Sequence, residues 1–277
     1  MSAAPEVLTS IGCDYITATA SSPDYAQRLH SLASALFRHQ SLIGNEPKAW
    51  GMAGFKGWKC GSVQVGTRDK EVIVRLSSDA AYISWSSLMD HAENVSRMDL
   101  QATIRIPDDV TKRIDGYKRR ARRDSASSGN RKRVRWVQEH HGGYTLYLGN
   151  RQSNVFGRIY DKHAESKMVQ HKACIRFEAQ YQDKMALYVA RELHRVPSPI
   201  PHIASYLCQF FQSRAVGLEL PYDAGATYSC SRPRSDAEKN LEWLQKSVRP
   251  CILRLIDSGL GEEVYRALGL IDDAESK

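Results

Sequence analysis

A short run of residues in the second half of the chain, Val155 to Lys162 (VFGRIYDK), sets a tyrosine between two cationic side chains. In an extended strand alternate side chains point to the same face, so Arg158, Tyr160 and Lys162 would share one surface. A phenol has a pKa of roughly 10 in water, and nearby positive charge favours its ionised form. Tyr160 is therefore a candidate nucleophile with Arg158 and Lys162 as catalytic partners. A strand tyrosine that only packs is the alternative.

Acidic side chains on two other predicted strands could lie near this tyrosine. Alternation within Val95–Ile106 puts Asp99 on a polar face, and alternation within Arg176–Gln180 does the same for Glu178. If these strands share a sheet with Tyr160, the two carboxylates could hold Mg²⁺ or Mn²⁺ through oxygen ligands. An ion pair with a neighbouring arginine is the alternative for each acid.

Asp14 is a different kind of acid, because its alternation partners are Ile16 and Ala18. This pattern places it on a more apolar stripe of the first predicted strand. We expect it to be either a buried, hydrogen-bonded carboxyl group or a third ligand of the metal.

The positive charge of the chain is concentrated in one segment. The 277 residues carry a formal charge of +8, whereas residues 112–135 hold eleven basic residues and two acids, and eleven minus two is +9. Such a segment is typical of a nucleic-acid contact surface, and a solvated helix face is the alternative. The residues expected to bind DNA are Arg119, Arg120, Arg122, Arg123, Arg131, Lys132 and Arg133.

Several classes of protein are excluded by the sequence. A composition with 42% hydrophobic and 25% charged residues is that of a globular protein. The six cysteines form no CxxC pair, and neither a GxxxxGK[ST] loop nor a GxSxG elbow occurs. No stretch is apolar enough to span a membrane and the start does not resemble a signal peptide, so we expect a cytoplasmic location in a bacterial host.

Periodicity along the chain predicts an α+β fold with an antiparallel-rich sheet, helices packed on one face and a helical C-terminal region. Strands are expected over Ile11–Ala20, Glu71–Leu76, Val95–Ile106, Tyr144–Leu148, Val155–Lys162 and Ala173–Tyr181. Asp108–Arg123 is expected to be a helix that is followed by a flexible loop over Asp124–Asn130. We expect a catalytic domain over residues 1–183, including the basic segment 112–135, and a helical region over residues 184–277.

Two neighbouring motifs carry a resemblance to a known family. Tyr144–Ser153 (YTLYLGNRQS) followed by Gly157–Lys162 (GRIYDK) resembles the central signature of the replication initiation factor family. This family comprises rolling-circle initiators and relaxases of plasmids, filamentous phages and integrative elements. Similar, shorter matches are VSRMDL over Val95–Leu100, IRFE over Ile175–Glu178 and CDYI over Cys13–Ile16.

The resemblance implies a metal-dependent, site-specific DNA nickase of a phage or plasmid. Tyr160, in the family's Arg-x-Tyr-Asp-Lys motif, would attack the scissile phosphodiester and leave a 5′-phosphotyrosine and a 3′-OH primer, and the same site would rejoin ends at termination. Asp99 and Glu178 match the acidic positions. Members often carry a second aspartate four residues after the first, where this chain has Thr103.

The expected partners are origin DNA, single-stranded or extruded as a hairpin at the nick site, and a host helicase, because the chain has no motor motif. The sequence leaves open whether the chain forms a homodimer. A non-catalytic DNA- or RNA-binding regulator of a phage or plasmid is the alternative function. A membrane-surface protein is weakly supported, because the basic segment lacks the apolar helix face of an interfacial anchor.

Overall fold

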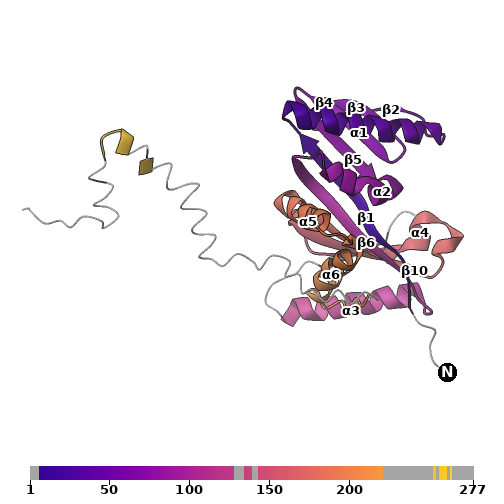
Figure 1. The fold of residues 1–277 in the computed structure, drawn as a ribbon. Helices are drawn as coiled ribbons and strands as arrows, with labels where there is room; N and C mark the ends of the chain where they lie inside the picture. The colour runs from indigo at the N-terminus through magenta and orange to yellow at the C-terminus, as the bar shows by residue number, and fades with distance from the viewer. Residues whose placement is uncertain are drawn as a thin grey trace, which may run out of the picture. The chain divides into compact units, whose positions relative to one another are not determined.

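The computed structural model of the chain describes residues 6–127, 134–138 and 143–220, together with residues 252–253, 256–260 and 263. Ten strands form one antiparallel sheet in the order β2-β3-β4-β5-β1-β6-β10-β9-β8-β7 (Figure 1). The strands are β1 (Val7–Ala20), β2 (Lys48–Met52), β3 (Phe55–Cys60), β4 (Val63–Arg68), β5 (Glu71–Ser77), β6 (Asn94–Arg105), β7 (Val134–Gln138), β8 (Tyr144–Leu148), β9 (Val155–Asp161) and β10 (Cys174–Gln182).

Five long helices accompany the sheet, and a short helix and a 3₁₀ turn follow β9. The helices are α1 (Pro23–Leu42), α2 (Ser78–Met89), α3 (Val110–Ser127), α4 (Lys162–Ser166), α5 (Asp183–Arg195) and α6 (Pro199–Gln212), and the 3₁₀ turn is η1 (Val169–His171). The long helices cover the apolar face of the sheet, which confirms the predicted fold class.

The division of the sheet into two faces follows from strict alternation in its central strands. In β10, Phe177 and Tyr181 point to the helices, where the Phe177 ring meets Tyr117 of α3 and Phe211 of α6 at centroid distances of 5.6 and 5.2 Å. Between them along the same strand, Glu178 points to the other face. The polar residues of β6, β9 and β10 therefore gather on the face opposite the long helices.

A glycine in β9 lets α6 approach the sheet closely. A Cβ atom at Gly157 would lie 2.3 Å from Cε1 of Phe210, so no larger residue fits without a shift of the helix. This contact brings β9 and its neighbours into the core while their polar side chains remain on the opposite face.

Some expected boundaries differ from those observed, and β1 begins at Val7 rather than at Ile11. Residues 124–127, which were expected to form a loop, continue α3, because Ser and Ala tolerate a helix and no proline or glycine interrupts it before Gly129. Pro199 and Pro201 lie in the first turn of α6, where the missing N–H groups need no partner.

The chain divides into two compact units, Met1–Tyr228 and Ser229–Lys277. The helices α5 and α6, expected within the C-terminal helical region, contact β6 and β10 inside the first unit. Most of the part of this expected helical region beyond residue 220 lies outside the described residues. Among the helices that are described, none is long and apolar enough to cross a bilayer.

Candidate functional site

The candidate site lies on the polar face of the sheet, where two rows of residues cross neighbouring strands. One row runs from Thr145 through Tyr160 and Arg176 to Thr103. The adjacent row runs through Tyr147, Arg158, Glu178 and Gln101. Tyr160 is directly opposite Arg176, and Glu178 is its diagonal neighbour on β10, within reach of a long side chain, so the pairing of β9 with β10 brings the predicted nucleophile beside a predicted acid.

Tyr160 and Glu178 form the centre of this site. The phenol oxygen of Tyr160 donates a hydrogen bond to Oε1 of Glu178, and Nη2 of Arg158 donates to Oε2 of the same carboxylate. Tyr160 is 6% exposed and Glu178 is 2% exposed. A buried carboxylate is costly unless it is paired, and these two hydrogen bonds pair Glu178 and fix it beside the tyrosine.

Arg176 connects Glu178 to a second acid. Its Nη1 lies 3.2 Å from Oδ1 of Asp14 and 3.9 Å from Oε1 of Glu178, and its Nε donates to Thr103 Oγ1 at 3.0 Å. The guanidinium group therefore occupies the space between the two carboxylates. Thr103, which stands where family members often have aspartate, serves here to orient this arginine.

Asp14 reaches the polar face because β1 contains a bulge. The register with β6 shifts between Cys13, opposite Leu100, and Tyr15, opposite Asp99, which leaves Asp14 as the extra residue. Strict alternation would have kept it with Ile16 and Ala18, which are buried on the helix side. A bulge redirects a side chain in this way, and it is the reason that the expected apolar stripe is wrong for Asp14.

The environment of Tyr160 keeps its phenol protonated. Burial raises the pKa of Tyr160 well above 10, and the negative charge of Glu178 raises it further against the opposing effect of Arg176. We expected Arg158 and Lys162 to favour the phenolate, and their charged ends lie 5.9 and 6.0 Å from the Tyr160 ring centroid. Their influence does not offset burial and Glu178, so attack by Tyr160 requires transfer of its proton to a base.

The predicted metal ligands do not come together as a set of three. Asp99 is 2% exposed and is held by Arg97 through two bonds, Nε to Oδ1 at 2.9 Å and Nη2 to Oδ2 at 2.6 Å. Asp14 and Glu178 line one pocket, but Arg176 lies between them. Among the described residues no group of three acids, histidines or cysteines could hold a metal ion. This arrangement does not fit a three-carboxylate site, and Mg²⁺ or Mn²⁺ stays a prediction.

Lys162 lies at the end of β9, where Asp161 turns the chain into α4. Oδ1 of Asp161 accepts bonds from the backbone N–H groups of His163 and Ala164 at 2.8 and 3.0 Å, which is an N-cap. The Lys162 ammonium group donates to Oε2 of Glu165 at 2.7 Å. The motif that contains Tyr160 thus also ends its strand.

A pocket of about 220 Å³ opens over Tyr160. Its lining residues are Asp14, Thr145, Tyr147, Arg158, Tyr160, Glu165 and Glu178. A second pocket of about 420 Å³ shares Arg158 with the first and is lined by Arg97, Arg151, Phe156, Arg158, Gln180 and Gln182. The two pockets are therefore neighbours on the polar face, with Arg158 lining both.

The comparison with protein families agrees with this geometry. Residues 89–211 match the model of the replication initiation factors, a range that runs from the end of α2 to α6 and holds Tyr160, Arg158, Arg176 and Glu178. This segment, 123 of the 277 residues, is similar to the replication initiation factors. Asp14 lies outside the matched range, and it is the fold that brings it next to Arg176 within that range.

A solved structure shares the fold. It is that of a rolling circle replication initiator protein from Geobacillus stearothermophilus, with a TM-score of 0.53 and 19% sequence identity over 72% of this chain and 85% of that chain. At this identity the likeness shows the architecture alone. No curated protein matches the chain.

The basic helix α3 lies within the family segment but on the other face of the sheet. Its Ile114, Tyr117 and Ala121 are buried against the sheet, and Tyr117 meets Phe177 on the helix side. The arginines expected to bind DNA project away from the sheet and are exposed at positions 119, 120, 122 and 123. Arg131, Lys132 and Arg133 lie outside the described residues.

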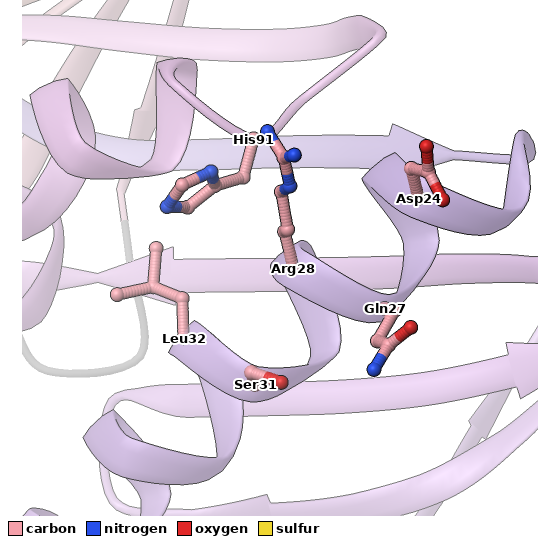
Figure 2. A pocket seen from close by; sticks show the side chains of 6 residues that line it. All are labelled: Asp24, Gln27, Arg28, Ser31, Leu32 and His91. Carbon is pink, nitrogen blue, oxygen red and sulfur yellow. The ribbon is translucent and has the colours of Figure 1, made fainter.

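A larger hollow, of about 540 Å³, lies elsewhere and lacks the chemistry of the site. Figure 2 shows Arg28 and four other lining side chains on α1, with His91 approaching from the turn after α2. Helix α1 packs against β3, β4 and β5, toward the other end of the strand order from β9. Size alone does not identify the site, because no tyrosine and no acid pair line this hollow.

Sequence reasoning missed three residues that line the Tyr160 pocket: Thr145, Tyr147 and Glu165. Alternation within Tyr144–Leu148 places the first two on one face, so the signal was present once β8 is known to pair with β9. Glu165 follows Lys162 by three residues, a spacing at which helical side chains meet, but a helix of only five residues gives little periodicity.

Proposed function

We propose that the chain initiates rolling-circle DNA replication by cutting one strand of its origin, with Tyr160 as the nucleophile. The observation that supports this most directly is the hydrogen bond from the Tyr160 phenol to the buried Glu178 carboxylate, inside the replication initiation factor segment. A nucleophile paired with a base is the arrangement that covalent phosphoryl transfer requires.

In the proposed reaction the Tyr160 oxygen attacks the scissile phosphorus in line with the 3′-oxygen. The phenol proton passes to Glu178 as the new oxygen–phosphorus bond forms. The bond from phosphorus to the 3′-oxygen breaks, and that oxygen takes a proton from water. The products are a 5′-phosphotyrosine and a free 3′-OH that can prime synthesis. Reversal of these steps would rejoin ends, because the phosphodiester energy is kept in the tyrosine linkage.

The arginines around Tyr160 would stabilise the transition state. Arg158 and Arg176 flank the phenol, and both are held in place by carboxylates rather than free to rotate. Burial lowers the pKa of Arg158, but the negative charge of Glu178 and its hydrogen bond outweigh burial and raise it, so this side chain stays cationic. Fixed positive charge aimed at the non-bridging oxygens of a phosphate lowers the barrier to its transfer.

The substrate would be a single strand rather than a duplex, because Tyr160 is almost fully buried and only an unpaired strand can enter a pocket of about 220 Å³. Since the chain contains no ATPase loop, we propose that a host helicase unwinds the origin. The exposed arginines of α3, on the other face of the sheet, would hold duplex DNA away from the nick site.

Covalent trapping tests this proposal. The protein is incubated with supercoiled DNA that carries the origin of its genetic element, digested with protease and nuclease, and the labelled peptide is mapped by mass spectrometry. We expect the adduct on Tyr160, no adduct in Tyr160→Phe, and a normal adduct in Tyr25→Phe, which changes an exposed tyrosine of α1.

An adduct on another residue would overturn the assignment. Binding without any adduct would favour the non-catalytic regulator. Parallel reactions with EDTA, Mg²⁺ or Mn²⁺ test the predicted metal dependence separately.

A further inference from the structure

We propose that Arg135 and Arg151 form a clamp for the phosphate backbone of single-stranded DNA next to the scissile bond. This inference rests on the proposed function, because it names how the strand that reaches Tyr160 is held. The two arginines come from different elements, β7 and the turn between β8 and β9, and each lies against the same aromatic ring.

The ring of Tyr147 contacts both arginines. Its ring centroid lies 4.9 Å from Cζ of Arg135 and 5.2 Å from Cζ of Arg151. The ring is 8% exposed and stacks on Phe156 with 8° between the planes. A tyrosine buried in this way is a fixed support, and the cation–π contacts orient both guanidinium groups before any ligand arrives.

The turn that carries Arg151 is itself anchored. The Gln182 side chain donates to the backbone oxygen of Arg151 at 2.9 Å, and Oδ1 of Asn150 accepts from the backbone N–H of Gln152 at 3.2 Å. Ser153 Oγ donates to the carbonyls of Asn150 and Val155, which closes the turn. The position of Arg151 is therefore set by the sheet.

The charges of these two arginines are available to a ligand, unlike those of their neighbours. Arg97 is paired with Asp99, and Arg158 is paired with Glu178. Within the described parts of the chain, no carboxylate pairs with Arg135 or Arg151, and both side chains are exposed. An uncompensated pair of guanidinium groups on a rigid support is suited to phosphate oxygens.

The position of the clamp identifies the strand that it would hold. Arg135, Tyr147 and Arg158 are directly opposed on β7, β8 and β9, and Arg158 contacts the carboxylate that accepts the Tyr160 bond. Arg151 lines the neighbouring pocket, which shares Arg158 with the Tyr160 pocket. A strand with its scissile phosphate at Tyr160 would thus pass its next phosphates along this row. The α3 arginines, on the opposite face, would contact other phosphates.

Binding of a short fluorescent oligothymidine, followed by anisotropy, tests the clamp in a Tyr160→Phe background that cannot cleave. We expect Arg135→Ala/Arg151→Ala to weaken binding about tenfold at low salt. The slope of log K against log salt should fall by about 1.4, since each phosphate contact on a single strand contributes about 0.7. Affinity for a duplex should change much less.

The matched control is Arg28→Ala/Arg38→Ala, which removes two exposed arginines from α1. The charge-retaining variant Arg135→Lys/Arg151→Lys should keep most of the salt slope, and unchanged thermal unfolding would show that each variant is folded. The clamp is overturned if the alanine pair binds the oligothymidine as tightly as the control pair, or if duplex binding falls equally. These binding measurements do not depend on nicking. Failure of the clamp is therefore distinguished from failure of the proposed function, which covalent trapping at Tyr160 tests.

Discussion

The two faces of the sheet around β8, β9 and β10 carry positive charge in different ways. On the polar face, Arg97, Arg158 and Arg176 are each bound to a carboxylate that is largely buried. On the helix face, α3 presents exposed arginines at positions 119, 120, 122 and 123 to solvent, with one ion pair from Arg119 to Asp115.

This difference separates two tasks that the total charge of +8 does not distinguish. Paired, buried arginines have a fixed geometry, which suits charge stabilisation at a reacting phosphate. Exposed arginines are mobile and screened by salt, which suits sequence-independent attachment to a DNA backbone. Substitutions on the polar face should therefore change the rate of cutting, and those on α3 should change binding.

The largest effect is expected for Tyr160→Phe. Removing the nucleophile should lower the nicking rate by about a thousandfold or more and leave DNA affinity within about twofold, because no phosphate contact is lost. Gel analysis of supercoiled origin DNA and an anisotropy titration measure the two quantities. Normal nicking by this variant, or an equal loss of DNA binding, would contradict the assignment of cutting to the polar face and of binding to α3.

Glu178→Gln should lower the nicking rate by about a hundredfold or more at neutral pH, as expected for loss of a general base. Because burial, the largest cause, still raises the pKa of Tyr160 in this variant, the phenolate fraction, and with it the rate, should rise about tenfold for each unit of pH between neutrality and pH 9. The parent enzyme should show no such rise. Identical pH profiles would remove the role of Glu178 as base.

The pKa of Tyr160 also predicts how stability changes with pH. The phenol ionises at a higher pH in the folded chain than in the unfolded chain, so the unfolded state loses its proton first as the pH rises. The contribution of Tyr160 to stability is full below the unfolded pKa of roughly 10 and is lost above it. Denaturant unfolding at neutral and strongly alkaline pH should show a smaller alkaline loss in Tyr160→Phe than in the parent.

Neutralising the basic helix should have a smaller effect, and on binding alone. Substituting glutamine for Arg119, Arg120, Arg122 and Arg123 would reduce the slope of log K against log salt for duplex DNA by up to about 3.6, at about 0.9 per phosphate contact. The rate of cutting at saturating DNA should stay within a few fold of the parent rate. An unchanged slope would refute a DNA contact by α3.

The smallest expected effect concerns the contact between Gly157 of β9 and Phe210 of α6, which packs α6 against the sheet. Gly157→Ala would force Phe210 of α6 away from β9, and overpacking of this kind costs about 1 to 3 kcal/mol of unfolding free energy. Thermal unfolding measures this loss, with Gly116→Ala in α3, where an added Cβ meets nothing within 4 Å, as the matched control. Equal stability of the two variants would contradict a tightly packed contact between Gly157 and Phe210.

Much of the fold could be predicted because alternation and helical spacing are local properties. The strands over Val95–Ile106 and Val155–Lys162 were found within about one residue of their observed bounds. The shared face of Arg158 and Tyr160 follows from the same alternation. The sequence did not predict which strands pair over long sequence distances, such as the position of β10 between β6 and β9. Register between such strands depends on packing of the whole sheet.

By itself, the sequence determined the element types, the motif around Tyr160 and the concentration of charge in residues 112–135. Only the tertiary structure decided which charges meet. In the tertiary structure Tyr160 donates a hydrogen bond to Glu178, and Asp99 is paired with Arg97. A bulge in β1 places Asp14 on the polar face. The tertiary structure also placed α3 on the face opposite Tyr160. The physical reason is that a side chain's face is set by its own strand, whereas its partner is set by the strand that the fold places next to it.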